Sequence, residues 1–336
     1  MLQLAAVVVA LVVGAAAPAI LRPLLVEWNV VDVPNARSSH SVTAIRGFGI
    51  APAAAAVLGL AILLASGIDS GVRLVAVVLA TIAAAAILGW IEDSSGLRVM
   101  TRLGYQLIIG AAAAAVIFQP FGEYWWVIVI SAVALAWYIN VANFMDGING
   151  ISGSHGAIVG LTYAACGWYA QLDWLTLAGL VFAVAFATFL PWNLLRKGTF
   201  LGDVGSYALG AGVASLALAA LSVGVSLVVV VGPVVIYLAD TAVTLVRRIF
   251  AGEDWREAHR SHVYQRLVTA GRSHVRVTVY VGIATVLVAA AGLLTLVSPQ
   301  LWAVSIALMV VLAVVYLSLP RLLQKSRPSV RMESQS

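Results

Sequence analysis

Two acidic side chains stand where one long apolar run of this sequence ends. Glu92 and Asp93 are adjacent in the segment GWIEDSSGL. Adjacent carboxylates repel each other, so a divalent cation or a cationic substrate group would stabilise them, and hard oxygen ligands suit Mg²⁺. A helix end that faces water explains the pair equally well. The pair by itself therefore leaves metal binding and a plain helix stop open.

The segment YINVANFMDGINGISG combines amides with one acid. Asn140, Asn143 and Asp146 follow one another at intervals of three, which places them on one face of a helix until Gly147 and Gly150 loosen the chain. Amides both donate and accept hydrogen bonds, as recognition of a nucleobase or a sugar requires, and a carboxylate binds metal or accepts a proton. Hydrogen bonding between membrane helices is the structural alternative. The clustering around one aspartate favours a binding function.

A glycine-rich turn opens a later apolar run in the segment PWNLLRKGTFLGDVGSYALG. It contains Asn193, Phe200 and Asp203. Glycine lets a ligand approach the backbone, and the N–H groups at a helix start attract phosphate. Asp203 would repel that phosphate unless a cation lay between them, so the turn predicts a metal-bridged phosphate. The alternative is that Asp203 caps the helix that follows.

A buried acid precedes a basic segment near the end of the ninth apolar run. Asp240 lies seven residues before Arg247, on the same helical face, and an acid in that position needs a partner. The basic and histidine side chains that follow, partly in AHRSHVYQRL, are Arg247, Arg248, His259, His262 and Arg266. This array suits a pyrophosphate, and an anionic ligand is favoured over zinc because the chain contains a single cysteine.

One further polar segment, VDVPNARSSHSVTAIRGFG, lies between the first two apolar runs. Its polar variety exceeds what a simple basic loop needs, although solvated loops are also where polar residues normally collect. The candidate substrate-binding residues in it are Asn35, Arg37, His40 and Arg46.

These segments must be positioned by membrane helices. The 336 residues are 62% apolar and 10% charged, with a mean hydropathy of +1.02, outside the range of ordinary soluble domains. Cys166 lies inside an apolar run, so a disulfide framework is excluded and redox chemistry is disfavoured. We predict an all-α, polytopic integral membrane protein of about eleven transmembrane helices, with ten as the alternative count. The predicted spans are 2–26, 44–67, 71–91, 103–118, 123–142, 153–171, 174–195, 204–221, 224–246, 275–297 and 299–320.

The positive charges predict the orientation of these spans. All of the 19 Lys and Arg residues except Arg73 fall in or beside alternate connections and the C-terminal end. We therefore expect the N-terminus outside, the catalytic loops in the cytoplasm, and a net charge of +5 that reflects topology and not nucleic-acid binding. We expect residues 1–322 to form a single transmembrane catalytic domain and 323–336 a cytoplasmic, basic, disordered tail. Met1 to Ala19 lacks a basic n-region, which disfavours a cleaved signal peptide.

In combination, NFMDGINGISG, FLGDVGSYALG and AHRSHVYQRL resemble signature segments of the polyprenyl-phosphate N-acetylhexosamine-1-phosphate transferases, glycosyltransferase family 4. The resemblance spans roughly residues 1 to 320, and the histidine segment is similar to that of the branches that begin O-antigen or cell-wall polymers. It implies Mg²⁺, with Mn²⁺ as an alternative, at Asp203 and Asp93. It implies catalytic functions for Glu92, Asp93, Asp146, His259, His262 and Arg266, and substrate contacts for Asn143, Asn149, Asn193 and Phe200. Most relatives have Asp where this chain has Glu92 and Asn149.

The resemblance implies a reaction in which a polyprenyl phosphate, such as undecaprenyl phosphate, attacks a UDP-N-acetylhexosamine and releases UMP. The expected partners are those two substrates and membrane lipid, with no nucleic acid, and a homodimer is a further expectation. The expected location is a bacterial inner membrane, and the identity of the amino sugar stays open.

Three rival functions remain to be weighed. A transporter would place its charges near mid-membrane between broken helices, whereas most charges here gather at one face. A CDP-alcohol phosphotransferase would show a dense run of aspartates, which the sequence lacks. An inactive scaffold of the same fold is suggested by the departures at Glu92 and Asn149, but the retained acids and histidines argue against it.

Overall fold

The computed structural model describes residues 2–28, 31–32, 44–45, 47–68, 70–119, 125–196, 198–253 and 260–324. Nearly all of these residues are helical, which confirms the all-α class. Within these ranges the two strands are β1 (Val31–Asp32) and β2 (Ala44–Ile45), an antiparallel pair in which Val31 lies opposite Ile45. The helices are α1 (Leu2–Glu27), α2 (Ile50–Ala65), α3 (Val72–Ser95), α4 (Val99–Ile117), α5 (Trp125–Met145), α6 (Ile151–Tyr169), α7 (Asp173–Ala187), α8 (Leu190–Leu195), α9 (Gly202–Ser222), α10 (Leu227–Val231), α11 (Val235–Phe250), α12 (Val263–Thr269), α13 (His274–Val297) and α14 (Trp302–Gln324), with 3₁₀ turns at Gly232–Val234 and Pro299–Leu301.

Nine helical segments among the described residues are long and apolar enough to cross a membrane. Two of them join shorter helices, because α7 runs into α8 and α10 runs through a 3₁₀ turn into α11. The helix α2 is shorter, with 16 residues, and α6 does not count among the nine. Every predicted span coincides with one helix or with joined helices, which confirms a multi-pass membrane protein. The count of eleven and the orientation stay predictions.

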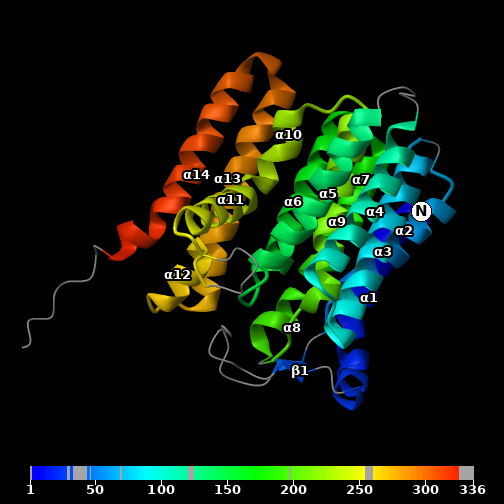
Figure 1. Ribbon diagram of the computed structural model, residues 1–336. Helices are drawn as coiled ribbons and strands as arrows, with labels where there is room; N and C mark the ends of the chain where they lie inside the picture. The colour runs from blue at the N-terminus through cyan, green and yellow to red at the C-terminus, as the bar shows by residue number, and fades with distance from the viewer. Residues whose placement is uncertain are drawn as a thin grey trace, which may run out of the picture.

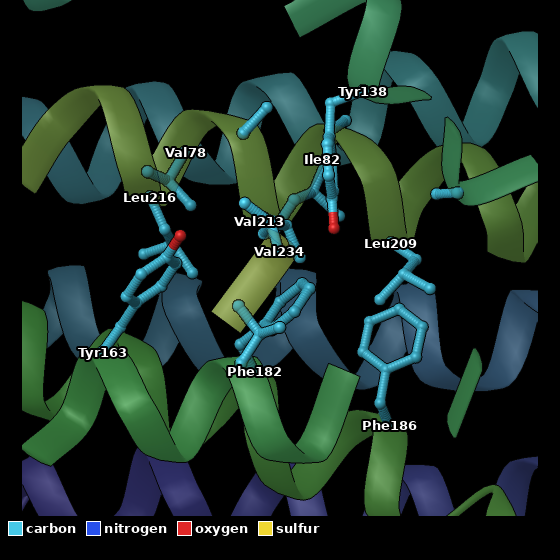
Figure 2. Packing of buried hydrophobic residues seen from close by; sticks show 14 of the residues in the cluster. Val78, Ile82, Tyr138, Tyr163, Phe182, Phe186, Leu209, Val213, Leu216 and Val234 are labelled. Atoms are coloured by element: carbon cyan, nitrogen blue, oxygen red, sulfur yellow. The ribbon is translucent and has the colours of Figure 1, made fainter. Parts of the chain in front are cut away.

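The helix α9 lies at the centre of the bundle. In its most apolar stretch 83% of the residues are buried, against 22% in α1 and α14. Figure 2 shows Leu209, Val213 and Leu216 of α9 between aromatic side chains such as Phe182 of α7 and aliphatic side chains such as Val78 of α3. A helix that is apolar on all sides is expected to be buried by its neighbours. The polar residues at the start of α9 are therefore held by a well-packed helix.

Two groups of helices can be distinguished in Figure 1. Helices α1 to α9 form the main bundle, and α11 to α14 lie on one side of it. The short elements α8, α12 and β1 lie toward the same end of the molecule. The start of α9 and the ends of α3 and α5 also lie at this end, so the polar segments of the sequence converge there.

Candidate active site

Asp203 lies in the first turn of α9 and is joined to the end of α5. The amide nitrogen Nδ2 of Asn143 donates to Asp203 Oδ1 at 2.6 Å and to Ser206 Oγ at 3.1 Å. These contacts connect residues about 60 positions apart in the chain. Asn143 and Asp203, which the sequence singles out separately, therefore lie in one site.

Asp93 caps the start of α9 from another helix. Its Oδ2 accepts the backbone N–H of Val204 at 2.9 Å, and α9 has no side-chain cap of its own. The alternative that Asp203 caps α9 is therefore wrong, because Asp93 supplies the negative charge that favours a helix N-terminus. Capping by Asp93 leaves the Asp203 side chain for other contacts.

Glycines allow this approach of α3 to α9. A Cβ on Gly89, one turn before Asp93, would overlap the carbonyl group of Asp203. Gly202 has a φ of +73°, and a Cβ there would lie 2.7 Å from Asp93 Oδ2. A side chain at either position would push the acids apart or strain the backbone.

Asp146 follows the last residue of α5 and is half-buried beside the other two acids. Its Oδ1 accepts a hydrogen bond from Ser152 Oγ at 2.6 Å. The pKa of Asp146 is raised to about 7, chiefly by burial; the hydrogen bond from Ser152 opposes the rise, and the negative charges of Asp203 and Asp93 add to it. The carboxylates of Asp203 and Asp93 thus both lie within electrostatic range of Asp146. We call Asp93, Asp146, Asp203 and Asn143 the acidic centre.

The acidic centre offers oxygen ligands from carboxylates and one amide. Among the residues that the structure describes, no group of three or more His, Cys, Asp or Glu is arranged to hold a metal ion by itself. Mg²⁺ usually binds one or two carboxylates and completes its shell with phosphate oxygens and water. The donor chemistry of the acidic centre therefore fits Mg²⁺ shared with a phosphate substrate, and it does not resemble a structural zinc site.

Glu92 faces a different environment from Asp93. Its Oε1 lies 2.8 Å from Arg102 Nη1, and its Oε2 accepts the backbone N–H of Leu97 at 2.6 Å. These partners belong to the corner between α3 and α4. The structure thus separates the two adjacent acids, and a catalytic function of Glu92 stays a prediction that these contacts do not support.

Two asparagines predicted to contact substrate are used within the protein. Asn140 Nδ2 donates to Gln106 Oε1 at 2.6 Å, an interhelical bond between α5 and α4. Buried Asn193 accepts the N–H of Gly150 and donates to the carbonyl of Thr199 at 2.6 Å. The structural alternative therefore accounts for Asn140, while Asn193 ties the start of α6 to the turn before α9.

The turn that contains Phe200 pairs with β2. The N–H of Ile45 donates to the carbonyl of Gly198 at 2.9 Å, and the N–H of Phe200 donates to Ile45 O at 3.3 Å. Phe200 is half-buried at this junction. On the other side of the site, Asn149 O accepts a hydrogen bond from Thr278 Oγ1 of α13 at 2.8 Å.

Asp240 is fully buried and lies at the centre of a second polar cluster. Its Oδ1 has three partners: His262 Nδ1 at 3.1 Å, the N–H of Val263 at 3.1 Å and Thr244 Oγ1 at 3.2 Å. Its Oδ2 accepts from the hydroxyl of Tyr316 at 2.7 Å. We call these five residues the Asp240 network. It joins α11, α12 and α14, and the Asp240 carboxylate cannot touch substrate.

The helix α12 packs against the end of α5. The hydroxyl of Tyr264 donates to the carbonyl of Phe144 at 2.9 Å, and the rings of His262 and Phe144 stack with centroids 6.4 Å apart. A Cβ on Gly147 would overlap the Tyr264 hydroxyl. His262 therefore lies beside the segment that carries Asn143 and Asp146.

The arginines differ in their surroundings. Arg247 is exposed, whereas Arg248 is buried and its Nε lies 2.8 Å from Glu253 Oε2. Burial lowers the pKa of Arg266, and the nearby positive charges of Arg247 and Arg321 lower it further. Three guanidinium groups thus gather beside the Asp240 network, an arrangement that a phosphate would stabilise.

The structure does not describe every predicted site residue. The predicted residues Asn35, Arg37, His40, Arg46 and His259 fall outside the described residues. The partners that the sequence analysis missed are Arg102, Ser152, Ser206, Tyr264, Tyr316 and Arg321. A tyrosine in an apolar span usually finds a partner for its hydroxyl, which is a weak signal for Tyr316. The sequence contains no sign that the partner is Asp240.

Part of this site lies in a segment that is similar to known proteins. Residues 75–221 match the family model described as glycosyl transferase family 4, which confirms the resemblance drawn from the sequence motifs. The matched segment contains the whole acidic centre. The Asp240 network and α12 lie beyond it.

Similar proteins extend further along the chain. The chain is 26% identical over 287 residues to a "probable undecaprenyl-phosphate N-acetylglucosaminyl 1-phosphate transferase" of Bacillus subtilis, covering 80% of this chain and 79% of the relative. It is 28% identical over 299 residues to a "decaprenyl-phosphate N-acetylglucosaminephosphotransferase" of Mycolicibacterium smegmatis, covering 76% and 72%. A "phospho-N-acetylmuramoyl-pentapeptide-transferase" of Streptococcus pyogenes is 33% identical over 126 residues, covering 37% of this chain and 33% of the relative.

Proposed function

We propose that this protein is a sugar-1-phosphate transferase acting on polyprenyl phosphate, because residues 75–221 match the model of glycosyl transferase family 4. In its finer form, the proposal is transfer of N-acetylhexosamine 1-phosphate from a UDP-sugar to undecaprenyl phosphate. The observation that carries it is the convergence of Asp93, Asp146, Asp203 and Asn143 from three separate helix ends inside the matched segment.

The proposed reaction is a phosphoryl transfer. An oxygen of the lipid phosphate forms a bond to the β-phosphorus of the UDP-sugar, and the bond from that phosphorus to the oxygen bridging to the α-phosphorus breaks. The bridging oxygen keeps the electron pair and leaves on UMP, and the product is polyprenyl diphosphate sugar. A phosphate oxygen is already anionic at neutral pH, so the attack needs little deprotonation. Catalysis then depends on positioning the two substrates and on neutralising their charge.

The residues of the acidic centre supply that positioning. Asp203 and Asp93, the pair that the resemblance implies, would hold Mg²⁺, with Mn²⁺ as a substitute and Asp146 beside them, while Oδ2 of Asp93 also caps α9. Bound Mg²⁺ would neutralise the charge that develops on the diphosphate. Asn143 orients Asp203 through its 2.6 Å hydrogen bond. Arg266, with Arg247 and Arg321 beside it, provides positive charge for the diphosphate and the lipid phosphate.

The choice of sugar and lipid follows two relatives whose similarity covers 80% and 76% of this chain. Their names contain N-acetylglucosamine, and one is an undecaprenyl-phosphate and one a decaprenyl-phosphate transferase. We propose N-acetylglucosamine as the first sugar to test, with undecaprenyl phosphate as the acceptor. The product would begin a cell-envelope glycan such as O-antigen. We place the protein in the bacterial inner membrane with its active site toward the cytoplasm; a homodimer stays a prediction.

The test is release of UMP by the purified full chain in lipid nanodiscs. The reaction would contain undecaprenyl phosphate, Mg²⁺ and, one at a time, UDP-N-acetylglucosamine, UDP-N-acetylgalactosamine and a UDP-6-deoxy amino sugar. We expect UMP release that requires the lipid, stops with EDTA and returns when Mg²⁺ or Mn²⁺ is added. Omitting the lipid controls for simple hydrolysis of the UDP-sugar.

The rival functions give different results in this test. A folded protein that releases no UMP with any donor would overturn the proposal and favour the inactive scaffold. Uptake of labelled substrate into sealed vesicles without UMP release would favour a transporter. Release of UMP that EDTA leaves unchanged would remove the metal from the proposal but keep the transferase.

A further inference from the structure

Ser152 is a buried residue of α6 that contacts the acidic centre from behind. Its hydroxyl donates to Asp146 Oδ1 at 2.6 Å, and the residue is 3% exposed, so the substrates do not reach it. Asp146 itself is half-buried, and Ser152 is the one residue of the described ranges that donates a hydrogen bond to its carboxylate. An ionised carboxylate offers about four acceptor sites. Ser152 therefore occupies Oδ1 and leaves Oδ2 of Asp146 for other contacts.

The bond from Ser152 restricts how the Asp146 side chain can turn. Asp146 lies between the end of α5 and the start of α6, so no helix backbone fixes its position. The negative charges of Asp203 and Asp93 act on Asp146, and their repulsion favours a rotation of its carboxylate away from them. A short hydrogen bond is directional and opposes such a rotation. Ser152 thus helps to keep the three carboxylates together.

Tyr237 of α11 holds the turn of α6 that contains Ser152. Its hydroxyl donates at 3.1 Å to the carbonyl of Ile151, the residue directly before Ser152. A carbonyl oxygen has two lone pairs, so it can accept this bond in addition to a helix bond. Tyr237 is 0% exposed, and its hydroxyl lies close to Ser152 and within electrostatic range of Asp146. The effect of Tyr237 on Asp146 would therefore pass through Ser152.

The ring of Tyr237 is held separately from its hydroxyl. The ring stacks on the imidazole of His155, with centroids 3.6 Å apart and an interplanar angle of 9°. Nε2 of His155 in turn lies 2.7 Å from the hydroxyl of Tyr138 on α5. Phenylalanine at position 237 would keep the stacked ring and lose the bond to Ile151. This substitution therefore removes the contact with α6 and leaves the packing in place.

We infer that Ser152 and Tyr237 are positioning residues that hold the Asp146 carboxylate in the acidic centre, with Oδ2 toward the reacting phosphates. The inference rests on the proposed transferase function. Ser152 acts through Asp146, and Tyr237 acts through Ser152. A residue that orients a functional carboxylate through a hydrogen bond typically contributes on the order of 10- to 100-fold.

A double-mutant cycle in the full chain tests this order of action. UMP release from UDP-N-acetylglucosamine and undecaprenyl phosphate would be measured for Ser152→Ala, Tyr237→Phe and the double variant. We expect kcat to fall roughly 10- to 100-fold in Ser152→Ala and about three- to tenfold in Tyr237→Phe, with an unchanged KM for the UDP-sugar. In the Ser152→Ala background, Tyr237→Phe should add less than about twofold. Losses that multiply would overturn the inference, because Tyr237 would then act independently of Ser152.

Two matched substitutions separate positioning from simple packing. Tyr163→Phe removes another buried hydroxyl between neighbouring parts of the chain, since Tyr163 of α6 donates to the carbonyl of Val230 in α10 at 3.0 Å. Ser215→Ala removes a fully buried hydroxyl that bonds within its own helix, α9. We expect each control to lower Tm about as much as its counterpart and to leave kcat unchanged. Equal losses of kcat in the controls and in Ser152→Ala and Tyr237→Phe would overturn the inference.

The unmodified chain, measured in the same assay, distinguishes this inference from the proposed function. If the unmodified chain released no UMP with any donor, the transferase function would be overturned, and the inference with it. If the unmodified chain released UMP and Ser152→Ala kept the same kcat, the inference alone would be overturned.

Discussion

The acidic centre and the Asp240 network hold their side chains in different ways. In the acidic centre, α3 and α9 touch through their backbones at Gly89 and Asp203, and a side chain of one helix caps the other. In the Asp240 network, three helices meet through hydrogen bonds to one buried carboxylate. The first lies inside the family match and the second beyond it. The side chains that we propose to share a metal and a phosphate are thus held by close backbone packing together with hydrogen bonds, whereas the buried carboxylate joins its helices through polar contacts alone.

This difference predicts that the acidic centre and the Asp240 network respond differently to substitutions. A backbone contact leaves no room for an added atom, because protein interiors are close-packed. A hydrogen-bonded cluster keeps its shape when one hydroxyl is removed and loses a limited amount of free energy. The acidic centre should therefore respond steeply to added volume or lost charge, and the region around α12 should respond in smaller steps.

The largest effect is expected from Asp203→Asn. The substitution keeps the shape but removes the charge that would hold Mg²⁺ and pair with Asn143. UMP release should fall by roughly 10²- to 10³-fold or more, the size seen when one electrostatic stabiliser is removed. Asp173→Asn is the matched control, since Asp173 is exposed at the start of α7. Near-normal turnover in Asp203→Asn would remove Asp203 from the proposed metal site.

Gly89→Ala should have the next largest effect. The added methyl group would overlap the Asp203 carbonyl and force α3 away from α9, which costs about 1–3 kcal/mol of stability. A shift of about 1 Å in the reacting groups lowers turnover by roughly 10²-fold. The control is Gly104→Ala, because a Cβ at Gly104 meets nothing within 4 Å. Equal activity and equal thermal stability of the two variants would show that the backbone contact does not position the acids.

Tyr264→Phe tests how α12 is held against α5. It removes the hydrogen bond to the carbonyl of Phe144 but keeps the ring that stacks on His262. The lost bond is worth about 1 kcal/mol, so we expect turnover to fall by about three- to tenfold. Steady-state UMP release measures this loss, and the control is Tyr163→Phe, which removes a buried hydroxyl that donates to the carbonyl of Val230. A loss as large as that of Asp203→Asn would contradict the stepwise response expected of this region.

The smallest effect is expected from Glu92→Gln. Glu92 binds Arg102 and the Leu97 amide at the corner of α3 and α4, and partly exposed ion pairs contribute about 0–1 kcal/mol. Turnover should stay within about threefold of the parent, whereas Asp93→Asn should lower it by roughly 10²-fold, since Asp93 caps α9. Parallel UMP assays of the two variants measure this. Equal losses of turnover in Glu92→Gln and Asp93→Asn would support the catalytic function of Glu92 that the resemblance implies.

Hydrophobic runs predicted most of the fold. Each long apolar stretch became a helix because backbone groups in lipid must pair within their own segment. The helix α12 was missed, since its seven residues are too few to give a signal, and α8 was not separated from α7 in the predicted span 174–195. The ends of the helices were also imprecise, as for α14, which runs to Gln324 where residue 320 was predicted.

The residue types of the candidate site could be predicted from the sequence, whereas the contacts between these residues were harder to predict. Spacing correctly brought Asn143 and Asp146 to one helix end, and the rule that a buried acid needs a partner applied to Asp240. Sequence distance suggested Arg247 as that partner, but three of the four partners come from α12 and α14, and the fourth is Thr244 of α11. Such pairings depend on how helices pack, and one sequence contains no measure of that. The adjacency of Glu92 and Asp93 was misleading for a related reason, because consecutive residues on a helix face different neighbours.

The position of Tyr316 on α14 has a consequence for how the protein is made. Translation produces Asp93, Asp146 and Asp203 first, then Asp240 and His262, and the span with Tyr316 after them. A nascent chain can thus assemble the acidic centre while Asp240 still lacks one of its four donors. The polar contacts that join α11, α12 and α14 would be complete only once α14 has entered the bilayer, so the buried carboxylate of Asp240 would depend on that span for its full set of donors.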